Sequence, residues 1–150
     1  EKIQIQHHNI IASFFPKTFK KWKIKKRHKN LENEFGNSDY GIIFTQKYSN
    51  SKGHSLEINI VNAEASMKDY QDIIKNPNLI QGMNNTYLVN NNGYTAIETT
   101  YEENNHHEHN IVLKSNMLMT IIAIGIKNKK TLNHLVESID MNGLETYLQN

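Results

Sequence analysis

Apolar and polar positions follow regular patterns along this chain, and its longest apolar run, MLMTIIAIGI, occupies residues 117–126. A helix needs about 20 residues to cross a bilayer, so this shorter run is expected to be buried in protein. Gly125 permits close approach of neighbouring backbone within a strand. Five β-branched residues favour a strand over a helix: Thr120, Ile121, Ile122, Ile124 and Ile126. We therefore predict a central strand at 117–126, covered on both faces.

Alternating patterns just before this run predict further strands at residues 87–89, 93–102 and 109–114. An Asn-Gly pair at 92–93 is the strongest short signal for a tight hairpin between the first two of these strands. Ser115-Asn116 separates the third strand from the central one. The pattern therefore predicts an antiparallel meander of about four strands.

The remaining patterned segments predict a second strand pair and the helices. Alternation with period two indicates strands at 41–48 and 54–61, and helical stripes of apolar residues follow at 63–75 and 131–139. Thr131 is a suitable N-cap for the last helix, and Gly143 lies just past its expected end. A short helix is predicted at residues 9–15, while residues 1–6 alternate like a strand.

This order of elements is typical of an α+β fold. The length of 150 residues fits one domain. We predict a single domain over residues 1–150: an antiparallel sheet of about six to seven strands with helices packed on its faces. Residues 1–15 are expected to form an N-terminal strand/helix extension that packs on the body. An exposed sheet edge leaves the oligomeric state open.

The net charge of +2 conceals a strong asymmetry. Residues 17–29 carry eight of the 17 basic residues, whereas the rest of the chain carries nine against all 15 acidic residues. Trp22 and Ile24 alternate with lysines over residues 19–28, so we predict an edge strand with its lysines turned outward.

Three interpretations of this basic strip stay open: a solvated edge, a docking surface for an acidic protein, or a binder of anionic membranes or nucleic acid. Nucleic acid is the less favoured ligand, because specific domains gather basic residues from several elements. The predicted partner-binding residues are Lys20, Lys21, Trp22, Lys23, Lys25, Lys26 and Arg27.

A second candidate is the cluster EENNHHEH at residues 102–109. Imidazole and carboxylate groups are common ligands of zinc and other divalent ions, so His106, His107 and His109 are candidate metal ligands. The spacing is not that of a helical zinc site, and a solvated hairpin tip is the alternative interpretation.

No catalytic motif is present, so a non-enzymatic protein is expected. The serines lack the context of a nucleophile, and Glu57 and Glu98 are expected to face solvent from their strands. The chain has no cysteine, which excludes disulfides and thiolate metal sites. A chain that starts at Glu1 without Met fits either an exported protein whose signal has been removed or a chain trimmed for another reason. Of the two we expect an exported protein of the bacterial periplasm or cell envelope.

Several segments together resemble a known family. These are Phe15-Pro16, Trp22-Lys23, the strand LEINIV, the strands that begin GYTA and HNIVLK, and the closing helix that leads into Gly143-Leu144. The pattern resembles small exported bacterial proteins and lipoproteins with a PsbP-like α/β/α sandwich. The resemblance implies binding of other proteins without shared catalytic residues, in some members with help from a metal ion. An immunity or inhibitor protein directed at a secreted toxin is one concrete expectation.

Overall fold

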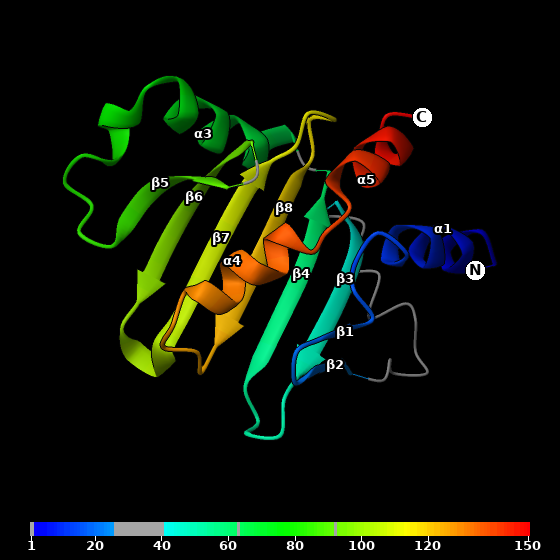
Figure 1. Ribbon diagram of the computed structural model, residues 1–150. Coiled ribbons are helices and arrows are strands. Elements are labelled where there is room, and N and C mark those ends of the chain that lie inside the picture. Colours follow the sequence, from blue (N-terminus) through cyan, green and yellow to red (C-terminus); the bar gives the residue numbers. More distant parts are fainter. Residues whose placement is uncertain (1, 26–40, 63, 92) are drawn as a thin grey trace.

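The computed structural model describes residues 2–25, 41–62, 64–91 and 93–150. These residues form one antiparallel sheet of eight strands with four α-helices around it (Figure 1). The strands are β1 (Thr18–Phe19), β2 (Trp22–Ile24), β3 (Ile42–Ser49), β4 (Ser55–Val61), β5 (Thr86–Asn91), β6 (Tyr94–Tyr101), β7 (His106–Val112) and β8 (Leu118–Ile124). The helices are α1 (Lys2–Ala12), α3 (Glu64–Lys75), α4 (Lys130–Glu137) and α5 (Met141–Leu148), with short 3-10 turns η2 (Pro77–Ile80) and η3 (Glu103–Asn105).

Strand β8 lies inside the sheet, whose order is β1-β2-β3-β4-β8-β7-β6-β5. It joins two hairpin blocks, because β4 pairs with one of its sides and β7 with the other. Met119, Ile121 and Ala123 are buried on one face and stand opposite the buried apolar residues of β4. The prediction of a central strand within residues 117–126 is therefore confirmed.

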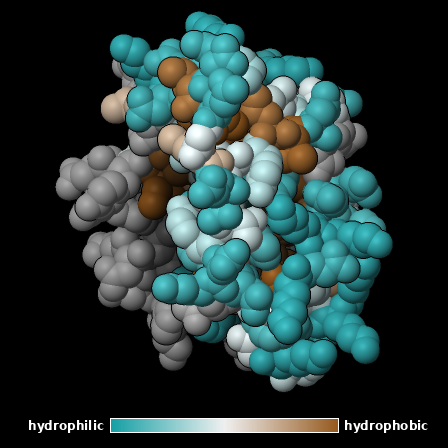
Figure 2. Space-filling model, turned by 90° about the vertical axis from the view of Figure 1, so that its left-hand side faces the viewer, coloured by the Kyte–Doolittle hydropathy of each residue, from teal (hydrophilic) through white to brown (hydrophobic). Residues whose placement is uncertain are grey.

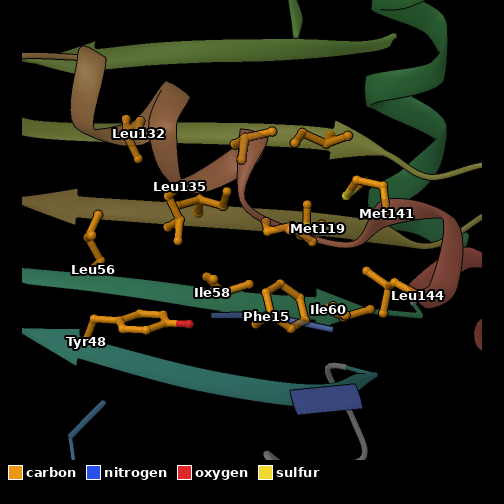
Figure 3. Packing of buried hydrophobic residues seen from close by; sticks show 14 of the residues in the cluster. Phe15, Tyr48, Leu56, Ile58, Ile60, Met119, Leu132, Leu135, Met141 and Leu144 are labelled. Atoms are coloured by element: carbon orange, nitrogen blue, oxygen red, sulfur yellow. The ribbon is translucent and has the colours of Figure 1, made fainter. Parts of the chain in front are cut away.

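The main core lies between this face of the sheet and helix α4. Leu132 and Leu135 of α4 point toward apolar side chains of β4 and β8, and Met141 and Leu144 extend the same layer along α5 (Figure 3). Helix α1 and the segment after it contribute Ile11 and Phe15, and the Phe15 ring stacks on Phe44. Burying each such side chain stabilises the fold by about 1.5–3 kcal/mol relative to exposure.

Helix α3 packs near β7 on the opposite face of the sheet. Its apolar stripe buries Met67, and Tyr70 is half-buried near Glu108, whose side chain points away from the main core. Desolvation raises the pKa of Tyr70, and the nearby Glu108 carboxylate adds to this effect. Within the described residues, no helix is long and apolar enough to cross a membrane.

Several expectations from the sequence need correction. The sheet has eight strands, because the basic segment forms the hairpin β1–β2 and not one edge strand. Residues 2–6 belong to helix α1 and not to a strand: the helix runs without a break from Lys2 to Ala12, and His8 and Ile11, about one turn apart, are buried on one side of it.

Gly143 does not end a helix but lies in the first turn of α5, where its N–H donates to the carboxylate of the N-cap Asp140 at 3.0 Å. A Cβ at this position would come within 2.7 Å of the Phe14 ring. Glycine is therefore used here for close packing. In the sequence the same glycine resembles the residue that ends a helix.

Gly125 lies just after strand β8 and not within it, and the close neighbour is the His54 side chain and not the backbone that the sequence predicts. Gly125 has φ +87°, and the His54 ring occupies the space that a Cβ at this position would need. Gly53 has a similar φ of +78° but open space around it, so it provides a matched control.

We expect Gly53→Ala to lower the free energy of unfolding by about 1 kcal/mol, through backbone strain alone. Gly125→Ala should lower the free energy of unfolding by about 1–3 kcal/mol more than Gly53→Ala does, because the His54 ring must also move. Urea denaturation of both variants measures the difference. Equal losses would show that the packing of His54 on Gly125 adds nothing to stability.

Candidate functional site

Strands β1 and β2 form a tight hairpin at one edge of the sheet. Phe19 stands opposite Trp22, and the two residues between them, Lys20 and Lys21, make the turn. Both aromatic side chains belong to the main core. The hairpin is therefore anchored from beneath while its turn stays in solvent.

The segment before the hairpin is fixed by Tyr48 of β3. The Tyr48 hydroxyl donates to the carbonyl of Pro16 at 2.6 Å and accepts from the Gln46 side chain at 2.8 Å. Burial raises the pKa of Tyr48 to about 12, so the phenol keeps the proton that it donates. After the hairpin, the N–H of Lys25 donates to the carbonyl of Lys47 at 2.9 Å. Both ends of the hairpin are thus tied to β3.

Five lysines in and beside this hairpin are exposed, and together we call them the basic hairpin: Lys17, Lys20, Lys21, Lys23 and Lys25. Within the described part of the chain, none of them forms an ion pair with a carboxylate. By contrast, Lys47 on the neighbouring strand pairs with Glu57 at 3.4 Å. Lys20 makes a polar side-chain contact: its Nζ donates to His134 Nδ1 of α4 at 2.6 Å.

Lys20 adopts a left-handed backbone conformation with φ +52°. The other described non-glycine residues with positive φ are Asn105 and Asn116, and Asn tolerates this region well. A lysine here costs about 1 kcal/mol, which glycine or asparagine would largely avoid. Backbone strain of this kind is retained where the side chain has a use.

The structure places the predicted partner-binding residues as follows. Lys20, Lys21, Lys23 and Lys25 are exposed together on the hairpin. Trp22 is only 6% exposed, so it serves as a core anchor and cannot act as a contact residue. Lys26 and Arg27 lie outside the described residues.

The three predicted metal ligands do not converge on one point. Successive residues of a strand point to opposite faces, so His106 is separated from His107 and His109. His107 is fully engaged: its Nε2 donates to the Ile126 carbonyl at 2.8 Å, and its Nδ1 lies 3.1 Å from the Thr100 hydroxyl. In the ranges that the structure describes, no group of three or more potential metal ligands comes together.

His109 belongs instead to a buried ionic cluster between the sheet and the start of α4. Its Nδ1 lies 3.8 Å from Glu98 Oε2, and Lys129 Nζ lies 2.7 Å from Glu98 Oε1. Lys129 also lies 4.9 Å from the centre of the Tyr87 ring on β5. A buried carboxylate requires a counter-charge, and Lys129 supplies it from the N-cap position of α4.

This cluster has a structural role. His109 is 0% exposed and Glu98 4%, so neither can touch a substrate from solvent. The contacts of Lys129 with Glu98 and Tyr87 hold the start of α4 over strands β5 and β6. The cluster therefore fixes the helix whose His134 meets Lys20 of the basic hairpin.

The expectation that Glu98 faces solvent is wrong. Glu98 is buried because it stands opposite His109 in the register of β6 and β7. The sequence did carry a signal: period-two alternation from Tyr94 and Ala96, both buried, places Glu98 on the same face. Glu57 is partly exposed beside Lys47, as its alternation predicts.

Comparison of the chain with protein-family models, curated proteins and solved structures found no significant match. The resemblance to PsbP-like exported proteins therefore stays a prediction. The functional argument depends on the geometry of the chain itself.

The buried position of His109 predicts a pH dependence of stability. Desolvation lowers the pKa of His109, and the Glu98 carboxylate offsets part of this effect. An unfolded histidine binds a proton near pH 6.5, so below about this pH the unfolded state holds more protons than the folded state. The stability that the protein has with a neutral, buried His109 is therefore complete above about pH 6.5. It is lost as the pH falls toward the pKa of His109 in the folded state.

We expect the free energy of unfolding of the wild type to fall more steeply between about pH 7 and about pH 5 than that of His109→Gln. Urea denaturation at several pH values measures both slopes. The carboxylates titrate in both proteins, so the difference isolates His109. Parallel slopes would contradict this assignment.

Proposed function

We propose that this protein is a non-enzymatic binding module that docks an acidic protein through the basic hairpin. The observation that carries the proposal is the set of exposed lysines that have no carboxylate partner among the described residues, held on a hairpin anchored by Phe19 and Trp22. Oriented charges of one sign speed the association of a complementary partner and suppress association with like-charged ones.

Anchoring of the hairpin also supports the proposal. Binding loses affinity when flexible segments must be ordered, and a hairpin already fixed to β3 avoids much of that cost. The strained turn at Lys20 also supports the proposal, because a lysine occupies a position where glycine or asparagine would be more stable.

The position of the aromatic residues favours a protein over nucleic acid or membrane. Proteins that bind single strands stack bases on exposed aromatic side chains, and interfacial segments insert aromatic residues into lipid. Phe19 and Trp22 are buried and cannot do either. An inhibitor or immunity protein for an acidic toxin is one form of this function, since it requires only a stable scaffold and a complementary charged surface.

The first test reverses the charge of the hairpin. Lys20, Lys21, Lys23 and Lys25 are changed together to Glu, and a control variant changes four exposed lysines elsewhere to Glu: Lys52, Lys68, Lys75 and Lys130. Both variants have the same net charge, so only the position of the change differs. The immobilised proteins are exposed to extracts of the source cells, and any captured protein is identified by mass spectrometry and titrated by calorimetry.

We expect an acidic protein to bind the wild type and the control, and to lose at least about tenfold in affinity with the hairpin variant. The salt dependence of its affinity should also flatten in that variant. Equal binding to both variants would contradict the proposal. Retention of wild type, but not the hairpin variant, on anionic vesicles or heparin alone would assign the hairpin to lipid or nucleic acid instead.

Substitution of Lys20 separates stability from binding. Lys20→Asn should leave the free energy of unfolding unchanged or raise it by up to about 1 kcal/mol, because Asn tolerates the left-handed turn. The same variant should weaken partner binding. Lys21→Asn is the control, since Lys21 has no positive φ and should show only the loss of affinity. A loss of stability in Lys20→Asn would show that Lys20 is retained for its contact with His134.

A further inference from the structure

The edge of the sheet opposite the basic hairpin is formed by β5, which among the described strands pairs only with β6. Protein edges of this kind are usually protected by short length, lysine, proline or a bulge. The edge at β1 is protected in this way, because β1 has two residues and lysines follow it. Strand β5 has six residues, TYLVNN, with neither a charge nor a proline, and its register with β6 is regular.

The surrounding sequence is also free of charge. No Asp, Glu, Lys, Arg or His occurs between Lys75 and Glu98, a stretch that includes η2, the following loop and β5. Three large apolar side chains in it are exposed: Leu79 by 54%, Met83 by 55% and Tyr87 by 48%. Figure 2 views the molecule from the side of β5 and α3, where apolar surface gathers in the upper part between hydrophilic side chains.

The register shows which backbone groups of β5 point outward. The N–H of Thr100 donates to the carbonyl of Asn85 at 2.9 Å, so this facing pair is hydrogen-bonded. Hydrogen-bonded and non-hydrogen-bonded pairs alternate along an antiparallel ladder. The N–H and C=O groups of Thr86, Leu88 and Asn90 therefore point away from β6, toward the open edge.

This arrangement is self-complementary. If two copies of β5 pair antiparallel about a twofold axis at Leu88, each Leu88 faces its counterpart, and Thr86 faces Asn90 of the other copy. Every outward N–H and C=O of these residues then finds a partner. On the other face of the strand Tyr87 stands opposite Val89 of the second copy, and aromatic residues pair favourably with β-branched ones across strands.

The charge distribution permits this pairing. The basic hairpin lies at the far end of the sheet, about 30 Å away at the usual strand spacing of about 4.8 Å. Charges at this distance are screened by salt at physiological ionic strength, where the Debye length is about 8 Å. Two uncharged β5 edges can therefore approach without repulsion, whereas two basic hairpins cannot.

We infer that the chain forms a symmetric dimer through β5, giving one continuous antiparallel sheet across two copies. The second copy is the occupant that fits this edge, because the strand matches itself in charge, in hydrogen-bonding groups and in its facing side chains. The two basic hairpins then lie at opposite ends of the dimer, free for partners. This inference does not depend on the proposed function.

Sedimentation equilibrium over a dilution series tests the inference with two pairs of variants. Asn90→Pro removes an outward N–H from an exposed position, which an edge strand tolerates, and Asn90→Ala keeps that N–H. Leu88→Lys places like charges across the twofold axis, and Asn142→Lys adds the same charge on the exposed surface of α5. Circular dichroism and thermal unfolding verify that each variant is folded.

We expect a concentration-dependent dimer for the wild type, Asn90→Ala and Asn142→Lys. Asn90→Pro and Leu88→Lys should raise the dimer dissociation constant at least tenfold. Amide hydrogen exchange at Thr86, Leu88 and Asn90 should slow with rising protein concentration. A wild type that is monomeric throughout, a dimer unaffected by Leu88→Lys, or exchange at these amides that is independent of concentration would overturn the inference.

Discussion

The pairing of β8 with β4 on one side and β7 on the other is the constraint on which the rest of the structure depends. It aligns Met119, Ile121 and Ala123 with the buried apolar residues of β4, and a slip of one residue would turn them to the wrong face. The same register brings His109 and Glu98 into the buried layer, where only a counter-charge from α4 makes a carboxylate tolerable. The centre of the sheet therefore dictates both the position of α4 and which strands are left at the edges.

The two edges differ in their chemistry. At one end the chain has concentrated lysines on a short, anchored hairpin, which both protects the edge and presents exposed positive charge. At the other end β5 is long for an edge, regular and uncharged. The buried ionic cluster stands between these surfaces, because Lys129 contacts Tyr87 of β5 while His134 of the same helix meets Lys20. Helix α4 thus links the two candidate interaction surfaces physically.

The sequence predicts the fold well where one periodicity dominates. Strands β3, β4, β6 and β8 and helices α3 and α4 follow from their patterns, because each buries one face: α4 on the main core, and α3 on the opposite face of the sheet. Helix α5 was missed because Gly143, which is needed for contact with Phe14, resembles a stop signal. The turn at Lys20 was missed because no Gly or Asn marks it. The partnership of Lys129 with Glu98 joins residues of two separate elements, so local patterns cannot reveal it, although alternation from Ala96 does place Glu98 inward.

The most direct test of the central claim is amide hydrogen exchange, read residue by residue, of the protein alone and in complex with its captured partner. If the basic hairpin is the docking surface, the added protection should be concentrated at residues 17–25 and at the His134 end of α4 that Lys20 contacts. Protection elsewhere with exchange in the hairpin unchanged would contradict the account, and would show that the exposed lysines serve only to protect the edge of the sheet.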